Sequence, residues 1–401
     1  MAVGRGAGRA WPVAARSMVA VCGAAALLVA APSCGRVDTG RGDGAPSAIE
    51  GARSVGGLGE APGKFGYPRT LELDVGADSE RGGARAWVID KTGRVQFVDG
   101  ATGECLRWWR MPETEVGKPV GMTIGVDAAG ERVMYVADTH YHRVIVYKLG
   151  EVSVEPGATG KGETLAAAAP AEVRRIGGYG MGPGEFIYPT DIAVLTGRGA
   201  DGRERAVRFY VGEYGGNDRI SVFDADWKFL FSFGSFGAGV GESAAGAASA
   251  GRDGSGTGGE VSAVQFDRPQ TVMLVPSSNG GMELLVCDSR NHRLGRFTLE
   301  GRLIGWIGSA EHPGRGLGEF RYPYGICDLG DGTVLVAEYG NNRVQRVELS
   351  SGRGLATWGR PGRGEGELAT PWAVAIVDRN ADGALCYRAI NSCLVPLPSM
   401  A

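Results

Sequence analysis

The sequence predicts an all-β fold, a six-bladed β-propeller of four-stranded antiparallel blades. Three observations predict it. Glycine is abundant, with 69 of 401 residues. This is about 17% of the chain, whereas soluble proteins average roughly 7%. One residue pattern recurs along the chain. Each copy contains four short runs of β-branched and aromatic residues between turn residues, and four strands in about 40 residues are typical of a propeller blade.

The recurring pattern begins with Gly-x-Phe-x-x-Pro, reaches an apolar–small–acidic triplet and then, about five residues later, an arginine that opens another strand. One copy contains Gly184–Pro189, the triplet Val211–Glu213 and Arg219. We call the segment before each proline the lead-in loop, and the proline opens the inner strand. The six lead-in prolines are Pro68, Pro119, Pro189, Pro269, Pro323 and Pro371.

These residues resemble the NHL-repeat family, whose pattern joins Phe-x-x-Pro, a Val-x-Asp strand end and an Asn-x-Arg strand start. The resemblance covers about residues 52–376 and implies a six-bladed propeller. After Val377 the pattern is lost, which a frame error or a degenerate last blade would both explain. Residues 52–56 match an outer strand with no blade before it. We therefore expect this N-terminal strand to close the sixth blade, which removes an open sheet edge.

The N-terminus predicts export. Three arginines precede an apolar stretch, Met18–Ala31, that is too short to span a bilayer comfortably. The residues around Cys34 resemble a bacterial lipoprotein processing site, with Ala31 and Pro32 as departures; the alternative is an ordinary signal peptide cut near Ala31. We thus expect a signal peptide at 1–33, a flexible tether at 34–50 and the propeller at 51–401, in the cell envelope or periplasm.

Charge and cysteine content exclude several classes of protein. The formal net charge is −3, and removal of residues 1–33 takes away three arginines and no acid, which leaves −6. Nucleic-acid binding rests on a basic surface, so we expect none. The five cysteines of the expected propeller form no C-x-x-C pair, so no structural zinc site or RING finger is indicated. We expect a monomer without cofactor.

The predicted strand order places the lead-in loops and the acid-to-arginine loops on one rim, at the mouth of the central channel. All four histidines map to this rim, together with many tyrosines. The residue after each lead-in proline differs in every blade, so this ring is the expected recognition surface, and Val120 supplies its sixth position. The candidate binding residues are Arg69, Thr190, Gln270, Tyr324, Trp372, His140, His142 and His292.

The repeated acids indicate structure and not catalysis, because a catalytic carboxylate needs one perturbed environment and these occur once per blade. We expect each acid to form a charge-assisted hydrogen bond with the arginine that follows it. The expected pairs are Asp90–Arg94, Asp138–Arg143, Glu213–Arg219, Asp288–Arg293 and Glu338–Arg343.

Two functions remain open. The first is a binding scaffold that contacts a protein, glycan or small ligand through the rim. The second is a propeller enzyme: relatives by architecture include a metal-dependent amidating lyase with histidine ligands and calcium-dependent lactonases. The variable ring has no carboxylate, which disfavours a lactonase, and no catalytic residue or metal site is assigned. NHL proteins fused to ubiquitin-ligase or RNA-binding modules do not match this chain.

Overall fold

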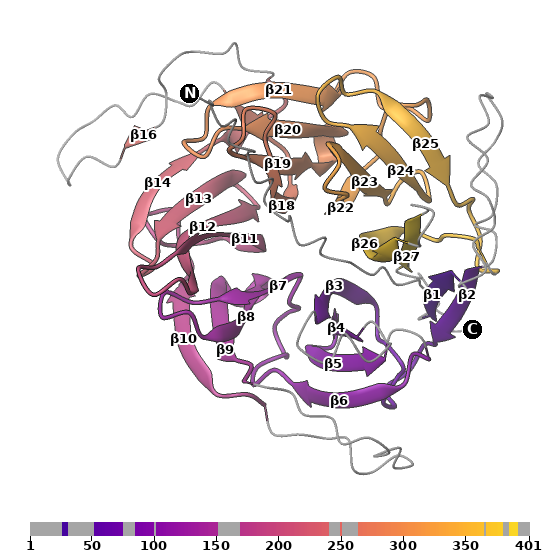
Figure 1. The fold of residues 1–401 in the computed structure, drawn as a ribbon, viewed down its shortest axis with the longest axis horizontal. Helices are drawn as coiled ribbons and strands as arrows, with labels where there is room; N and C mark the ends of the chain where they lie inside the picture. The colour runs from indigo at the N-terminus through magenta and orange to yellow at the C-terminus, as the bar shows by residue number, and fades with distance from the viewer. Residues whose placement is uncertain are drawn as a thin grey trace, which may run out of the picture.

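The computed structural model describes residues 26–30, 52–74, 85–99, 102–150, 169–239, 249–250, 264–364, 366–379 and 385–391. In these ranges the regular elements are strands and two 3-10 turns, η2 (Thr139–Tyr141) and η3 (Ser289–Asn291). The strands form sheets that stand around a common axis (Figure 1). The protein is thus a β-propeller. No helix among these residues is long and apolar enough to cross a membrane.

Five blades have four antiparallel strands each, paired in chain order from the inner to the outer edge. The first blade has β3 (Pro68–Asp74), β4 (Arg85–Asp90), β5 (Arg94–Asp99) and β6 (Cys105–Arg110). The second has β7 (Gly121–Val126), β8 (Arg132–Asp138), β9 (Arg143–Lys148) and β10 (Glu172–Gly177). The third has β11 (Tyr188–Arg198), β12 (Glu204–Tyr214), β13 (Arg219–Asp224) and β14 (Phe229–Phe233).

The fourth blade has β18 (Pro269–Pro276), β19 (Met282–Asp288), β20 (Arg293–Phe297) and β21 (Leu303–Gly308). The fifth has β22 (Pro323–Asp328), β23 (Thr333–Glu338), β24 (Arg343–Glu348) and β25 (Gly354–Trp358). Three short strands decorate the third blade and the loop after it: β15 (Ser235–Phe236), β16 (Ser249–Ala250) and β17 (Gln265–Phe266). Three of the lead-in prolines of these blades, Pro68, Pro269 and Pro323, open their inner strands as predicted, whereas Pro189 is the second residue of β11 and Pro119 lies two residues before β7.

The chain ends form two further two-stranded sheets. One joins β26 (Pro371–Arg379) to β27 (Leu385–Asn391), and the other joins β1 (Ala26–Ala30) to β2 (Ala52–Gly56). Strand β26 lies between β22 of the fifth blade and β3 of the first, and β27 contacts β1 (Figure 1). The predicted tether, 34–50, lies outside the described residues.

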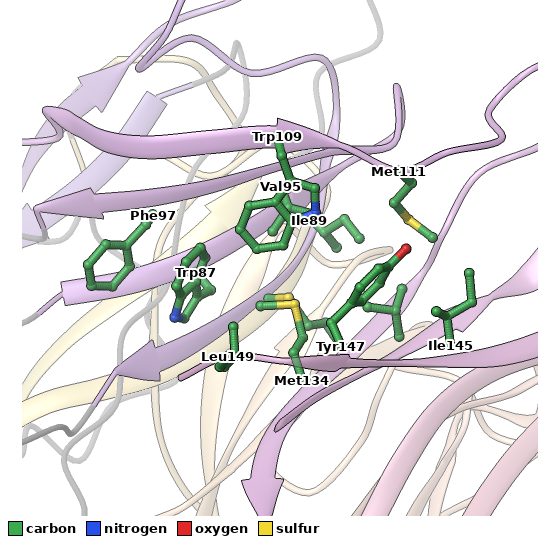
Figure 2. Close-up of a cluster of buried hydrophobic side chains, with 12 residues drawn as sticks. Trp87, Ile89, Val95, Phe97, Trp109, Met111, Met134, Ile145, Tyr147 and Leu149 are labelled. Atoms are coloured by element: carbon green, nitrogen blue, oxygen red, sulfur yellow. The ribbon is translucent and has the colours of Figure 1, made fainter. Parts of the chain in front are cut away.

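The hydrophobic core lies between blades, because a four-stranded sheet exposes two faces and each needs a neighbour. Between the first and second blades, Trp87 stacks on Phe97 at 4.4 Å between ring centroids and meets Trp109 edge-on at 5.1 Å. Met134 and Tyr147 of the second blade close this cluster (Figure 2). Cys287 and Cys327, in neighbouring blades, are buried and form no disulfide with each other.

Threonine hydroxyls link consecutive inner strands around the axis. Each donates a hydrogen bond to a backbone carbonyl of the next blade. The bonds are Thr70 to Val120 at 2.7 Å, Thr123 to Ile192 at 2.6 Å, Thr190 to Pro269 at 2.8 Å and Thr271 to Tyr324 at 2.5 Å. The links satisfy buried carbonyls where the sheets converge, so the inner strands hold one another in position.

Candidate functional site

The lead-in loops and the acid-to-arginine loops share one face of the ring. In four of the five blades, the carboxylate at the end of the second strand accepts a backbone N–H from a lead-in loop: Asp90 from Gly66 at 2.9 Å, Glu213 from Ile187 at 2.9 Å, Asp288 from Asp267 at 2.8 Å and Glu338 from Arg321 at 3.1 Å. We call this surface the loop face.

Each repeated acid lies within ion-pair distance of the arginine that follows it. The distances are 2.9 Å for Asp90–Arg94, 2.8 Å for Asp138–Arg143, 2.6 Å for Glu213–Arg219, 2.8 Å for Asp288–Arg293 and 2.5 Å for Glu338–Arg343. In the fifth blade the Arg343 guanidinium also donates to the carbonyls of Arg315, Gly316 and Glu319 in the lead-in loop. We call such a residue a clamp arginine, because it fixes the loop between two blades.

The second blade departs from this pattern. Arg143 pairs with Asp138 and, at 2.5 Å, with the Glu113 carboxylate, and it has no lead-in carbonyl partner among the described residues. Asp138 Oδ1 is buried without a hydrogen-bond partner. Burial raises the pKa of Asp138 to about 6, and the positive charge of Arg143 partly opposes this rise. The pKa of Asp288 is also raised to about 6, chiefly by burial.

The residue just before a clamp arginine links one blade to the next. His142, Asp218, His292 and Asn342 occupy this position, and all four have a positive φ. Asp218 Oδ1 accepts the N–H of Arg268 at 2.8 Å, His292 Nδ1 that of Tyr322 at 3.1 Å and Asn342 Oδ1 that of Thr370 at 2.7 Å. His142 Nδ1 contacts the carbonyl of Ile187.

The ring nitrogens of His142 and His292 therefore contact backbone groups of the neighbouring lead-in loops. His140 Nδ1 accepts the N–H of Lys118 at 3.1 Å, and His312 is exposed. The pKa values of His140 and His292 are lowered, in both cases mainly by burial. Among the described residues, no three histidine, cysteine or acidic side chains gather as a metal site would require.

The residues after the lead-in prolines divide into two groups. Five of the six stand at a bulge in their inner strand, where the register shifts, and the sixth, Val120, is a buried residue just before β7. Thr190 and Gln270 are buried; the Thr190 hydroxyl bonds to Pro269 and Gln270 Oε1 accepts from Arg268 Nε at 3.2 Å. Arg69, Tyr324 and Trp372 come together at the axis.

These last three residues belong to a larger group. The Arg69 guanidinium lies 3.9 Å from the ring centroid of Trp372, and the Arg268 guanidinium lies 4.8 Å from that of Tyr214 and 5.7 Å from that of Tyr324. Tyr324 stacks on Tyr339 at 4.8 Å and meets Trp372 edge-on at 4.6 Å. We call this group the central cluster: Arg69, Tyr214, Arg268, Tyr324, Tyr339 and Trp372.

The central cluster is cationic. Burial lowers the pKa of Arg69 to about 10, and the positive charge of Arg268 acts in the same direction. Burial also lowers the pKa of Lys91, and the charges of Lys118 and Arg69 add to this. Four cationic side chains thus influence one another electrostatically on the loop face.

One isolated acid lies on an inner strand beside the axis. Asp191 Oδ2 accepts the N–H of Val272 from the next blade at 3.2 Å, and burial raises the pKa of Asp191 to about 7. Neither an arginine nor a lysine forms an ion pair with it in the described part of the chain. The carboxyl group therefore acts as a backbone acceptor between two blades.

Solved structures of the same general architecture match the chain over most of its length. Selenomethionine-substituted virginiamycin B lyase from Staphylococcus aureus is 13% identical, with coverage of 75% of this chain and 72% of that chain and a TM-score of 0.39. A streptogramin B lyase is 12% identical, with 85% and 87% coverage and a TM-score of 0.44. A Bacteroides thetaiotaomicron protein of unknown function is 15% identical, with 84% and 71% coverage and a TM-score of 0.45.

No protein-family model matches the sequence, and no curated protein matches it. The similarity to the NHL-repeat family therefore stays a prediction from the repeated residues. At the identities and TM-scores above, the solved structures carry no argument about activity. The propeller assignment rests on the sheets of this chain.

Sequence reasoning missed Arg268, Lys91 and Lys118. Arg268 and Lys118 directly precede lead-in prolines, at the position held by Tyr67, Tyr188, Tyr322 and Thr370 in the other blades. A comparison of this position across the blades would have shown the two cations. Lys91 follows the acid Asp90, and its charge would have been apparent only once the two loop sets were placed side by side.

Proposed function

We propose that the protein is a ligand-binding module that holds its ligand at the central cluster on the loop face. The observation that supports this is the contrast between two kinds of arginine. The clamp arginines pair with buried acids, whereas Arg69 and Arg268 stack on aromatic rings and form no ion pair among the described residues. Interfaces that bind ligands are rich in arginine, tyrosine and tryptophan.

A binding role is favoured over a structural role for this cluster because Arg69 is desolvated and has no acidic partner in the described ranges. A desolvated guanidinium without an acidic partner destabilises the folded state. Residues that cost stability in this way gather where proteins bind or react. The partner class covered by this proposal is a protein, a glycan or a small ligand, bound by a monomer.

A screen of ligand classes tests the proposal. Neutral oligosaccharides, peptides, organic cations and organic anions would each be added to the protein, and the thermal unfolding midpoint would be measured. A ligand of the central cluster raises the midpoint of the native protein but not that of Tyr339→Ala. The control is Val207→Ala, which removes an exposed apolar side chain from the β11–β12 hairpin and should keep the response.

A bound compound that is also converted to product would instead support the enzyme alternative, of the metal-dependent lyase or lactonase type. Metal analysis of the purified protein would accompany the screen. One equivalent of zinc or calcium that is lost in His140→Ala would favour that alternative, because His140 would then be a ligand.

We also propose that the ring has six blades. Strands β26 and β27 would be the inner strands of the sixth blade, and β1 and β2 would be its outer strands. The position of β26 between β22 and β3 and the contact of β27 with β1 support this. Strand β1 falls within the stretch expected to be a signal peptide, so cleavage near Ala31 or at Cys34 would remove it. Export and lipidation at Cys34 stay predictions of the sequence.

A further inference from the structure

The central cluster and two lysines near it, Lys91 and Lys118, carry positive charge that the described protein does not neutralise. Arg69, Arg268, Lys91 and Lys118 have no carboxylate within ion-pair distance in the described ranges. Two acids beside Arg268 are already engaged. Asp218 accepts backbone N–H groups of Gly215, Gly216 and Arg268, and Asp267 lies 3.6 Å from Arg290. A bound anion would supply the missing counter-charge.

The position of Arg69 suits it to bind an anion. Its guanidinium carbon lies over the ring of Trp372, 3.9 Å from the ring centroid, an arrangement that arginine favours on aromatic rings. Its Nε is buried and has no hydrogen-bond partner. Buried N–H donors in folded proteins nearly always find an acceptor. Carboxylate and phosphate oxygens match the fork of a guanidinium and bind it in a bidentate manner.

The aromatic members of the cluster define the rest of the ligand. Tyr214 and Tyr339 are half-buried, whereas Tyr324 and Trp372 are buried at 6% and 8% exposure. The partly exposed rings lie beside the two arginines, so a ligand that reaches the guanidinium groups also touches Tyr214 and Tyr339. Flat carbon surfaces pack well on such rings.

An organic cation is a poor occupant of the same place. Aromatic groups that surround a cation bind it through their ring faces. Here Arg69 already covers Trp372, Arg268 lies over Tyr214 and Lys91 lies 4.4 Å from the ring centroid of Tyr67. A further positive charge would be repelled by the three side chains that occupy these faces.

We propose that the central cluster binds an organic anion: its carboxylate or phosphate oxygens accept hydrogen bonds from Arg69 and Arg268, and its carbon skeleton packs against the exposed parts of Tyr214 and Tyr339. This inference rests on the proposed function, because it names the ligand class of the same site.

Calorimetric titration of the full chain with four probes tests the inference. Benzoate and phenyl phosphate carry the two anionic groups, benzamide is a neutral compound of similar shape, and inorganic phosphate lacks the ring. We expect millimolar dissociation constants for the anions with a ring. Benzamide should bind at least about tenfold more weakly, because it lacks the negative charge that the two arginines would bind. The stronger of benzoate and phenyl phosphate identifies the oxyanion.

Variants locate the site. Arg69→Gln and Arg268→Gln should each weaken anion binding at least about tenfold, a loss typical of one charged hydrogen-bond donor. Arg302→Gln is the matched control, because Arg302 is exposed in the β20–β21 turn, away from the lead-in loops; it should bind like the native protein. Anion affinity should also fall as salt is raised.

A stability measurement separates binding from folding. Arg69→Met should keep or raise the thermal unfolding midpoint while anion binding is lost, because it removes a desolvated charge. A marked drop in the midpoint would assign Arg69 a structural role and overturn the inference. Equal affinity for benzamide and benzoate, or binding of neutral ligands alone, would also overturn the inference of an anion site. Either result would leave the proposed binding function intact. Absence of any binding at millimolar concentration would count against the inference.

Discussion

His292 accepts a hydrogen bond on Nδ1 from the backbone N–H of Tyr322, which belongs to the lead-in loop of the next blade. Asn342 makes the same bond to Thr370 one blade later, through its side-chain oxygen. Both residues have a positive φ, a conformation that asparagine tolerates better than most residues. The two side chains thus perform one structural task.

The first prediction is that asparagine replaces His292 without loss. His292→Ala should lower the free energy of unfolding by about 1–2 kcal/mol, because it leaves a backbone N–H without its partner. His292→Asn should be neutral or stabilising. Chemical denaturation of the three proteins at neutral pH measures the difference. A destabilised Asn variant with an intact Ala variant would show that the bond contributes nothing.

The second prediction is a pH dependence at the same residue. Burial lowers the pKa of His292, so the unfolded chain binds the proton more readily than the folded chain. The contribution is therefore present above the unfolded pKa of about 6.5 and is lost as the pH falls. The native protein should lose more stability than His292→Asn between about pH 7.5 and pH 5.5. Parallel curves for the two proteins would contradict this.

The third prediction compares two clamp positions. Arg343 bonds to Glu338 and to three lead-in carbonyls, whereas Arg143 pairs with Asp138 and the half-exposed Glu113. Arg343→Leu should cost about 3–5 kcal/mol, because Glu338 is then left buried and unpaired. Arg143→Leu should cost clearly less. Equal losses in denaturant unfolding would mean that the lead-in carbonyls add nothing to the clamp.

The fourth prediction concerns Asp191. Its pKa is raised to about 7 by burial, so the folded state binds the proton more readily than the unfolded state. Stability from this group is therefore full below the unfolded pKa of about 3.9 and is lost as the pH rises toward 7. Asp191→Asn keeps an oxygen for the N–H of Val272 and removes the titration.

The Asp191→Asn variant should be more stable than the native protein at about pH 8, by about 1–2 kcal/mol after allowance for solvent screening. The advantage should shrink at about pH 5, where the native carboxyl is protonated. Thermal unfolding at both pH values measures it. A variant that is less stable at high pH would show that the ionised carboxylate is needed there.

The parts of the fold that repeat were predictable from sequence, and the parts that depend on one blade were not. The inner strands and the acid–arginine spacing recur, so each copy supports the others. Thr190 and Arg69 share a sequence position, yet one side chain is buried between blades and the other reaches the axis. Both stand at a β-bulge, which re-aims a side chain, and sequence does not give its direction.

The central cluster was predictable only in part for a related reason. Tyr324 and Trp372 follow their prolines, but Arg268 precedes Pro269 and enters the cluster through a backbone with positive φ. The residue before a proline is normally extended. The bond from its N–H to Asp218 supports the unusual conformation, and the two residues lie 50 positions apart in the sequence, in consecutive blades.

The final prediction concerns the N-terminal strand β1, which pairs with β2 in antiparallel register from Ala26 opposite Gly56 to Ala30 opposite Ala52. If β1 and β2 are the outer strands of a sixth blade, a chain that starts at Pro32 should unfold at a lower temperature than the full chain. Loss of β1 leaves the edge of β2 unpaired and removes the contact of β1 with β27. Calorimetry of the two chains decides it. Equal midpoints would favour removal of this segment as a signal peptide, and the mass of the chain recovered from its native cell would then begin at or after Pro32.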